Sequence, residues 1–304
     1  MKKTFLLSAA LVANLAFGVE ETLWLEDVGE TPADSFLAMR ERLKALRTEK
    51  PGVTVRLRTL DAPASVVDEM RKFTNGTDVV WGDEFVGIPA TRVLQSGGGG
   101  TRPPGWWEDR LARNRKVIKA SGGKIDIVFL GDSITHFWET RGAPVYAELT
   151  NRYSVLNCGY GGDSTRHLIW REINGELDGY EAKCAMVMIG TNNRGDPGEI
   201  ARSIEKSVRI VRKRQPKAKV LLLAIFPRGA DASNRDRQRN DKINALIRGL
   251  ADGKDVFWMD LADRFLEPDG KLPKRLFFDY LHPSADGYRI WLDAVRPFFE
   301  QHVR

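Results

Sequence analysis

From residue 106 onwards, short apolar runs alternate with segments whose apolar residues recur at helical spacing. The runs are bounded by turn residues and comprise Ile125–Leu130, Val155–Cys158, Ala185–Ile189, Val220–Phe226 and Val256–Met259. One helical stripe consists of Ile200, Ile204, Val208 and Val211. Strands that are apolar throughout and alternate with amphipathic helices form parallel sheets covered on both faces. The pattern therefore predicts an α/β protein, a three-layer α/β/α sandwich around a five-stranded parallel sheet.

A smaller alternation precedes this region. Strands are expected at Thr22–Glu26, Val53–Leu60 and Asp78–Trp81, with one helix that carries Phe36, Met39, Leu43 and Leu46 and a second at Val66–Phe73. This order predicts a small βαβαβ segment over residues 19–95, to which the sequence assigns no role. Residues 96–105 (SGGGGTRPPG) have the composition of a flexible linker that ends in prolines. Residues 106–304 are therefore expected to form the main domain.

The first 18 residues have the organisation of a secretory signal peptide. Met1-Lys2-Lys3 is basic, residues 5–17 are mostly apolar, and Ala16-Phe17-Gly18 offers small residues for cleavage. The apolar run is too short to span a bilayer, and no other segment is long and apolar enough to do so. We therefore expect residues 1–18 to be removed and the mature chain to be secreted or periplasmic, without an integral membrane segment. A buried N-terminal helix is the alternative interpretation.

Composition and charge fit a soluble globular protein and exclude one class of partner. The chain has 304 residues, of which 42% are hydrophobic and 29% charged, and a formal net charge of +6. Its basic clusters, Lys206–Lys219 and Arg228–Lys242, lack the interleaved aromatic residues that a nucleic-acid groove would use. These clusters are expected to be solvated faces, and no nucleic-acid partner is expected.

Two cysteines in an exported chain could form a disulfide. Cys158 falls at the carboxyl end of one expected strand and Cys184 at the amino end of another. In a parallel sheet those ends lie at opposite edges, farther apart than a disulfide can reach. Two free, buried thiols are therefore expected.

Residues of types that can take part in catalysis follow the carboxyl ends of the expected strands, where open parallel sheets bind ligands. They are Gly131-Asp132-Ser133, Gly161-Gly162, Asn192-Asn193 and, farther along, Asp279 and His282. Acyl transfer by a nucleophile needs these types: a hydroxyl, a base, a carboxylate that orients the base, and donors for the oxyanion. No His-Glu-x-x-His or comparable metal-ligand spacing is present, so neither a metal nor a cofactor is expected.

These four blocks, in this order over residues 125–288, resemble those of the SGNH/GDSL hydrolase superfamily. The segments GDSTRHLIWR (162–171) and NGEL (174–177) resemble the platelet-activating-factor acetylhydrolase catalytic-subunit branch. The resemblance implies a flavodoxin-like sheet with Ser133 as nucleophile and His282 with Asp279 as its base pair. It also implies an oxyanion hole formed by the Gly162 N–H, the Asn192 side-chain amide and the Ser133 N–H.

Each site residue also has a purely structural interpretation. Ser133 could cap a helix, Gly161-Gly162 could form only a tight turn, and Asp279 could cap a short turn. We favour the turn interpretation for Asn193 alone. Asp132 and Asp163 are expected to accept backbone N–H groups in the turns that aim Ser133 and Gly162. Arg166 and Arg171 could form structural ion pairs or line the cleft, and we favour ion pairs.

Elimination among the four histidines points to His282 as the base. His302 lies near the end of the chain and is expected to be exposed. His136 is one helical turn past Ser133, where its ring would point along the helix rather than back to the hydroxyl. His167 is expected beside Gly162, where it could line the cleft without acting as the base.

The expected function is an exported serine esterase that hydrolyses small acyl esters, acetyl esters above all, with O-acetylated carbohydrates as plausible carriers. Alternatives are an O-acyltransferase on a glycan acceptor and a non-enzymatic glycan- or solute-binding protein. The second alternative rests on residues 51–55 (PGVTV) and 76–80 (GTDVV), which loosely resemble the opening of extracellular solute-binding proteins. A lipase is disfavoured because no long apolar lid segment is present. The sequence does not indicate an oligomeric state.

Overall fold

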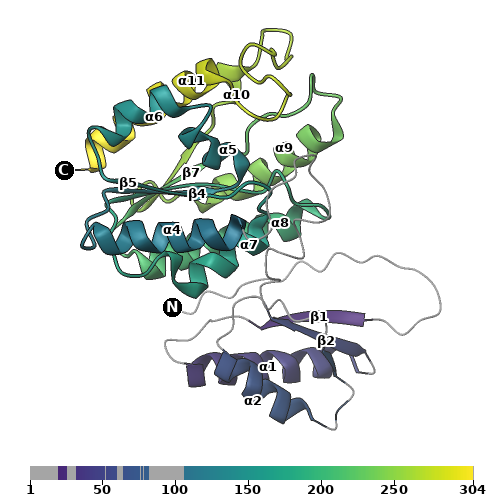
Figure 1. Ribbon diagram of the computed structural model, residues 1–304. Coiled ribbons are helices and arrows are strands. Elements are labelled where there is room, and N and C mark those ends of the chain that lie inside the picture. Colours follow the sequence, from purple (N-terminus) through teal and green to yellow (C-terminus); the bar gives the residue numbers. More distant parts are fainter. Residues whose placement is uncertain are drawn as a thin grey trace. The chain divides into compact units, whose positions relative to one another are not determined.

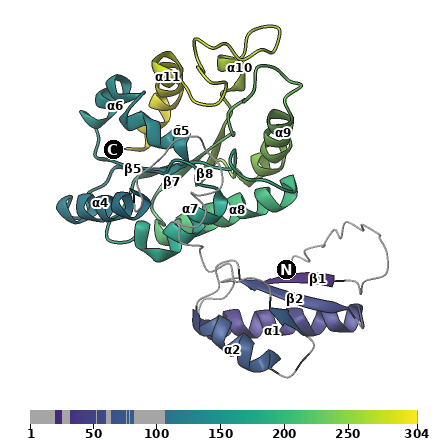
Figure 2. The same ribbon diagram turned by 45° about the vertical axis from the view of Figure 1, so that its right-hand side comes forward.

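A computed structural model describes residues 20–25, 32–51, 53–59, 64–75, 77, 79–81 and 106–303. The chain divides into two units, Met1–Val86 and Gly87–Arg304, each of which is described by itself (Figures 1 and 2). The expected signal peptide (residues 1–18) and linker (residues 96–105) lie outside the described residues.

The second unit is built around a parallel sheet of five strands in the order β5-β4-β6-β7-β8. The strands are β4 (Ile127–Gly131), β5 (Val155–Gly159), β6 (Cys184–Met188), β7 (Lys219–Leu223) and β8 (Val256–Met259). The chain starts the sheet at β4, adds β5 on one side, and then adds β6, β7 and β8 in turn on the other side. This is the flavodoxin-like strand order. The predicted fold class is confirmed.

Helices cover both faces of this sheet, as Figures 1 and 2 show. One layer contains α4 (Trp106–Ala120), α7 (Thr165–Arg171), the π-helical turn η2 (Glu172–Glu176), α8 (Pro197–Arg214), α9 (Arg235–Ile247) and the 3₁₀ turn η3 (Arg248–Leu250). The other contains α5 (Ser133–His136), the 3₁₀ turn η1 (Phe137–Glu139), α6 (Ala143–Thr150), α10 (Ala262–Phe265) and α11 (Ala285–His302).

Residues along each strand alternate between these two layers. Val128 and Leu130 pack against the α4, α7, α8 and α9 layer, whereas Ile127 and Phe129 pack against the α6, α10 and α11 layer. Cys158 and Cys184 are free and buried, in opposite hydrophobic clusters, as predicted. Both faces of the sheet are therefore covered by apolar side chains, and we expect polar functional groups at the ends of the strands.

The first unit is a βαβαβ succession, as the sequence predicts. It comprises β1 (Glu20–Leu25), α1 (Pro32–Glu49), β2 (Thr54–Thr59), α2 (Ala64–Thr74) and β3 (Val80–Trp81), with parallel strands in the order β1-β2-β3. Its core is a small apolar cluster that includes Leu25, Met39, Leu43, Leu57 and Met70. In neither unit do the described residues include a helix long and apolar enough to cross a membrane.

Candidate active site

Ser133 is the first residue of α5, which begins just after the carboxyl end of β4, an interior strand of the sheet. Two glycines allow α5 to approach the strand ends this closely. A Cβ atom on Gly159 would lie 2.3 Å from the His136 nitrogen, and one on Gly131 would lie 2.6 Å from the Met188 carbonyl oxygen. Neither position has room for a side chain. Gly131, the glycine of the Gly-Asp-Ser block, therefore allows Ser133 to lie close to the ends of the strands.

Asp132 is the N-cap of α5, since its carboxylate accepts a hydrogen bond of 2.9 Å from the Ile134 N–H. This is one of the turn-forming roles that the sequence predicts for it. From the opposite side, the Tyr288 hydroxyl of α11 donates to the Ile134 carbonyl at 2.6 Å. The short helix that carries Ser133 is thus held at its start by Asp132 and at its side by α11.

The Asp132 carboxyl is fully buried, and burial raises its pKa to about 7. The hydrogen bond from Ile134 and the charge of Arg228 oppose this effect, whereas the nearby Asp163 adds to it. A pKa raised above the value of an unfolded chain means that the folded state holds the proton more tightly. The ionised form is therefore the less favourable one in the folded protein.

We expect the free energy of unfolding of the wild type to fall, relative to Asp132→Asn, as pH rises from about 4 to about 7. Asparagine caps helices as well as aspartate does but does not titrate. A difference of about three pKa units corresponds to roughly 4 kcal/mol at most. Denaturant unfolding of both proteins across this range measures the difference, which should level off above pH 7. A constant difference would show that folding does not raise the pKa of Asp132.

The structure brings Ser133, His282 and Asp279 together. The Ser133 Oγ lies 2.8 Å from the His282 Nε2, across 149 positions of the sequence. The His282 Nδ1 lies 2.7 Å from the Asp279 Oδ2. Ser133 is 6% exposed, and the side chains of His282 and Asp279 are 16% and 38% exposed. The three side chains therefore form one hydrogen-bonded series from hydroxyl to imidazole to carboxylate. Its most exposed member is Asp279.

The loop of Asp279 and His282 is held in a strained conformation. Tyr280, between them, has a φ of +59°, which is uncommon for a residue with a large side chain. The Asp279 Oδ1 accepts the backbone N–H groups of Leu281 (3.0 Å) and His282 (2.7 Å), and the Tyr280 carbonyl accepts the Gly229 N–H. The Asp279 side chain thus caps its own turn and contacts the imidazole at the same time.

The pKa of Asp279 lies below its ordinary value. Partial burial raises the pKa of this carboxyl, but the hydrogen bonds from the His282 ring and backbone and from Leu281 lower it by more. The carboxylate is therefore ionised at neutral pH and able to stabilise a protonated imidazole. The ring centroids of Phe137 and Phe278 lie 4.9 and 6.2 Å from that of His282, so two apolar rings flank the imidazole.

The two residues expected to donate to an oxyanion follow the neighbouring strands. Gly162 is exposed and has a φ of +87°, a conformation that glycine adopts without strain. The Asn192 Nδ2 donates to the Asp163 carbonyl at 2.9 Å. An amide nitrogen carries two hydrogens, so one N–H of Asn192 is left for a ligand by this bond. Asp163 thus joins Gly162 by a peptide bond and Asn192 by a hydrogen bond.

The other candidate side chains have structural partners. The His167 Nδ1 accepts the Ser164 N–H at 2.9 Å and caps α7, and the His136 ring stacks on Trp106. Asn193 bonds the backbone and the hydroxyl of Thr165. The expectation that His302 is exposed was wrong. His302 is half-buried because its ring packs against Phe257 and Phe298.

Asp163 differs from its predicted role. Its carboxylate accepts the side-chain N–H groups of Trp107 (3.0 Å) and Arg171 (3.0 Å) instead of backbone N–H groups of its own turn. Arg171 forms buried ion pairs with Asp163 and Glu176, as the favoured interpretation of this arginine predicts. Trp107 and Glu176 were not identified from the sequence. Within the described residues, no group of three or more histidine, cysteine or acidic side chains could hold a metal ion.

The chain is similar to known proteins in both sequence and fold. The GDSL-like Lipase/Acylhydrolase family model matches residues 129–290. The platelet-activating factor acetylhydrolase IB subunit alpha2 of Rattus norvegicus is 36% identical over 177 residues, which cover 58% of this chain and 76% of that protein. The alpha1 subunit of Bos taurus is 36% identical over 177 residues, with 58% and 75% covered. A solved GDSL-like lipase from Bacteroides thetaiotaomicron shares the fold at 18% identity, with a TM-score of 0.54 over 63% of this chain and 97% of that one.

Proposed function

Because this chain belongs to the GDSL-like Lipase/Acylhydrolase family, we propose that it hydrolyses small acyl esters through Ser133, His282 and Asp279. Membership of this family makes the protein a hydrolase that acts on esters. The observation that carries the proposal is the continuous series Ser133 Oγ, His282 and Asp279, with contacts of 2.8 and 2.7 Å.

In the proposed mechanism, the Ser133 Oγ attacks the ester carbonyl while the His282 Nε2 accepts the hydroxyl proton. Asp279 accepts the hydrogen bond of the Nδ1–H, which sets the tautomer and stabilises the cation that forms. The tetrahedral intermediate collapses, and the alcohol leaves with the proton held by His282. Water then attacks the acyl-serine and transfers a proton to His282. The second tetrahedral intermediate collapses to the carboxylic acid, and His282 returns this proton to the leaving Ser133 Oγ, which restores the free enzyme.

The negative charge of each tetrahedral intermediate needs fixed donors. Ser133 supplies a backbone N–H at the first position of α5, where no intrahelical partner exists for it. We assign the other two donors to the Gly162 N–H and to the second N–H of the Asn192 amide. All three groups follow the carboxyl ends of adjacent strands, β5, β4 and β6, so one oxygen can be approached from three elements.

We further propose that acetyl is the preferred acyl group, that acetylated carbohydrates are natural carriers, and that the enzyme is exported. The two curated relatives described above are named acetylhydrolases, which supports the choice of acetyl as acyl group. Export is supported by the composition of residues 1–18 alone, and the choice of acetylated carbohydrates rests on that compartment together with the family.

The proposal is tested with the purified mature protein on acetyl, butyryl and octanoyl esters of p-nitrophenol and on acetylated sugars. We expect kcat/KM for the acetyl ester to exceed that for the butyryl ester by at least about tenfold, since each methylene that does not fit a pocket costs this much or more. Faster hydrolysis of octanoyl esters would contradict the preference for acetyl. Transfer of acetyl to an added glycan, with little free acetate, would instead identify an O-acyltransferase.

A further inference from the structure

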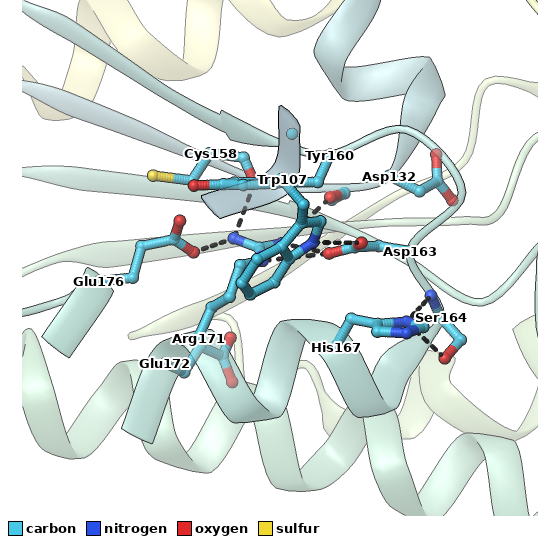
Figure 3. A network of polar contacts seen from close by, with 12 residues as sticks. Trp107, Asp132, Cys158, Tyr160, Asp163, Ser164, His167, Arg171, Glu172 and Glu176 are labelled. Carbon is cyan, nitrogen blue, oxygen red and sulfur yellow. Dashed lines mark hydrogen bonds and ion pairs between the residues drawn. The ribbon is translucent and has the colours of Figure 1, made fainter. Parts of the chain in front are cut away.

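Arg171, the last residue of α7, is fully buried and lies at the centre of a network of polar contacts (Figure 3). Its guanidinium lies between two buried carboxylates, Asp163 on one side and Glu176 on the other. The ring of Tyr160 stacks against it at 3.9 Å. One cation thus faces two carboxylates in a site that excludes water.

The remaining donors of Arg171 reach the strand ends that carry the proposed catalytic groups. Its Nη1 donates to the carbonyl of Cys158, at the end of β5, at 3.2 Å. Its Nη2 points to the carbonyl of Gly131, at the end of β4 and two residues before Ser133, at 3.4 Å. A single rigid guanidinium therefore connects both strands with the loop that follows β5.

Asp163 connects this cation with the proposed oxyanion donors. Its two carboxylate oxygens are occupied by the Arg171 Nε (3.0 Å) and the Trp107 Nε1 (3.0 Å). Its backbone follows Gly162 directly, and its carbonyl accepts the Asn192 Nδ2 at 2.9 Å. The orientation of the Gly162 peptide and of the Asn192 amide therefore depends on where the Asp163 side chain is held.

We propose that Arg171 and Asp163, with Trp107, are positioning residues that hold the Gly162 N–H and the Asn192 amide on the oxyanion of the reaction. The inference rests on the oxyanion roles proposed above for Gly162 and Asn192. Fixed donors stabilise developing charge because they need no reorganisation when it appears. A buried ion pair contributes little net stability compared with apolar packing, so this network has its value in fixing the geometry of the loop.

Glu176 offers a matched control. It pairs with the same guanidinium and is equally buried, but it belongs to η2 and lies on the side of Arg171 away from Asp163 (Figure 3). Asp163→Asn and Glu176→Gln each replace one carboxylate of Arg171 by an amide. Only the first leaves one acceptor oxygen for two donors, Arg171 and Trp107, and places an NH₂ group against one of them.

We expect Asp163→Asn to lower kcat and kcat/KM for p-nitrophenyl acetate by the same factor, about tenfold to a hundredfold, with KM unchanged. Asn192→Ala, which removes a donor outright, should lose roughly a hundredfold or more in the same assay. Glu176→Gln should retain the wild-type kcat. Rates are compared at a temperature at which thermal unfolding shows every variant to be folded.

Trp107→Phe keeps the aromatic packing but removes one donor to Asp163, and it decides the question if Asp163→Asn does not fold. We expect a smaller loss of kcat at unchanged KM. Equal kcat values for Asp163→Asn, Trp107→Phe and Glu176→Gln would overturn the positioning role. Ser133→Ala is measured alongside: wild-type activity in that variant would overturn the proposed function itself, whereas an inactive Ser133→Ala confines any failure to the network.

Discussion

Replacement of Ser133 by alanine is expected to lower kcat/KM for an acetyl ester by at least about 10⁴-fold while the protein stays folded. The change removes the Oγ, which lies 2.8 Å from the His282 Nε2. It leaves the cap of α5 intact, because the structure assigns this role to the Asp132 carboxylate rather than to the Ser133 hydroxyl. Loss of activity can therefore be separated from loss of the helix.

Ester hydrolysis and thermal unfolding of the same preparation measure the two effects. Ser203→Ala is a suitable control, since Ser203 lies on α8 and its hydroxyl bonds only the Glu199 carbonyl among the described residues. This variant should match the wild type in both measurements. A folded Ser133→Ala protein that hydrolyses the ester at the wild-type rate would contradict the assignment of Ser133 as nucleophile. An unfolded one would contradict the conclusion that α5 does not need the Ser133 hydroxyl.

The architecture of the second unit could be predicted because each layer imposes its own periodicity on the sequence. The run Val256–Met259 coincides with β8, and the predicted helical stripe from Ile200 to Val211 lies on α8. The expected strand Val220–Phe226 is too long, however, since β7 ends at Leu223. Ala224, Ile225 and Phe226 are 1–3% exposed but lie beyond the strand. Hydrophobicity reports burial, and burial continues where pairing of strands has ended.

The proximity of Ser133 and His282 could be inferred from topology, since both follow strands that end on one rim of a parallel sheet. The contact between Asp279 and His282 is local and follows from a spacing of three residues. The buried network beneath the rim carries no comparable signal. Trp107 and Asp163 are 56 positions apart, and nothing in the spacing of either residue indicates that the indole N–H meets that carboxylate. Side-chain pairing across layers depends on packing that a linear pattern does not contain.

Replacement of Asp279 by asparagine is expected to lower kcat/KM roughly 10³- to 10⁴-fold. An asparagine has one acceptor oxygen, so it can accept either from the backbone N–H groups or from the imidazole, but not from both. Asp279 now accepts three, from the His282 ring and from the backbone N–H groups of Leu281 and His282. If the amide oxygen stays with the backbone, the NH₂ group faces the His282 Nδ1 and favours the tautomer with its proton on Nε2, which cannot accept a proton from Ser133.

We expect Asp279 to act only through His282, and a comparison of single and double variants tests this. If it holds, Asp279→Asn combined with His282→Ala should be no slower than His282→Ala alone, because residues that act as a unit are not additive. Asp286→Asn, which neutralises an exposed carboxylate in the first turn of α11, should leave the rate unchanged. If the two losses instead multiply, Asp279 contributes by a route independent of the imidazole, and the series from Ser133 to Asp279 does not operate as one catalytic unit.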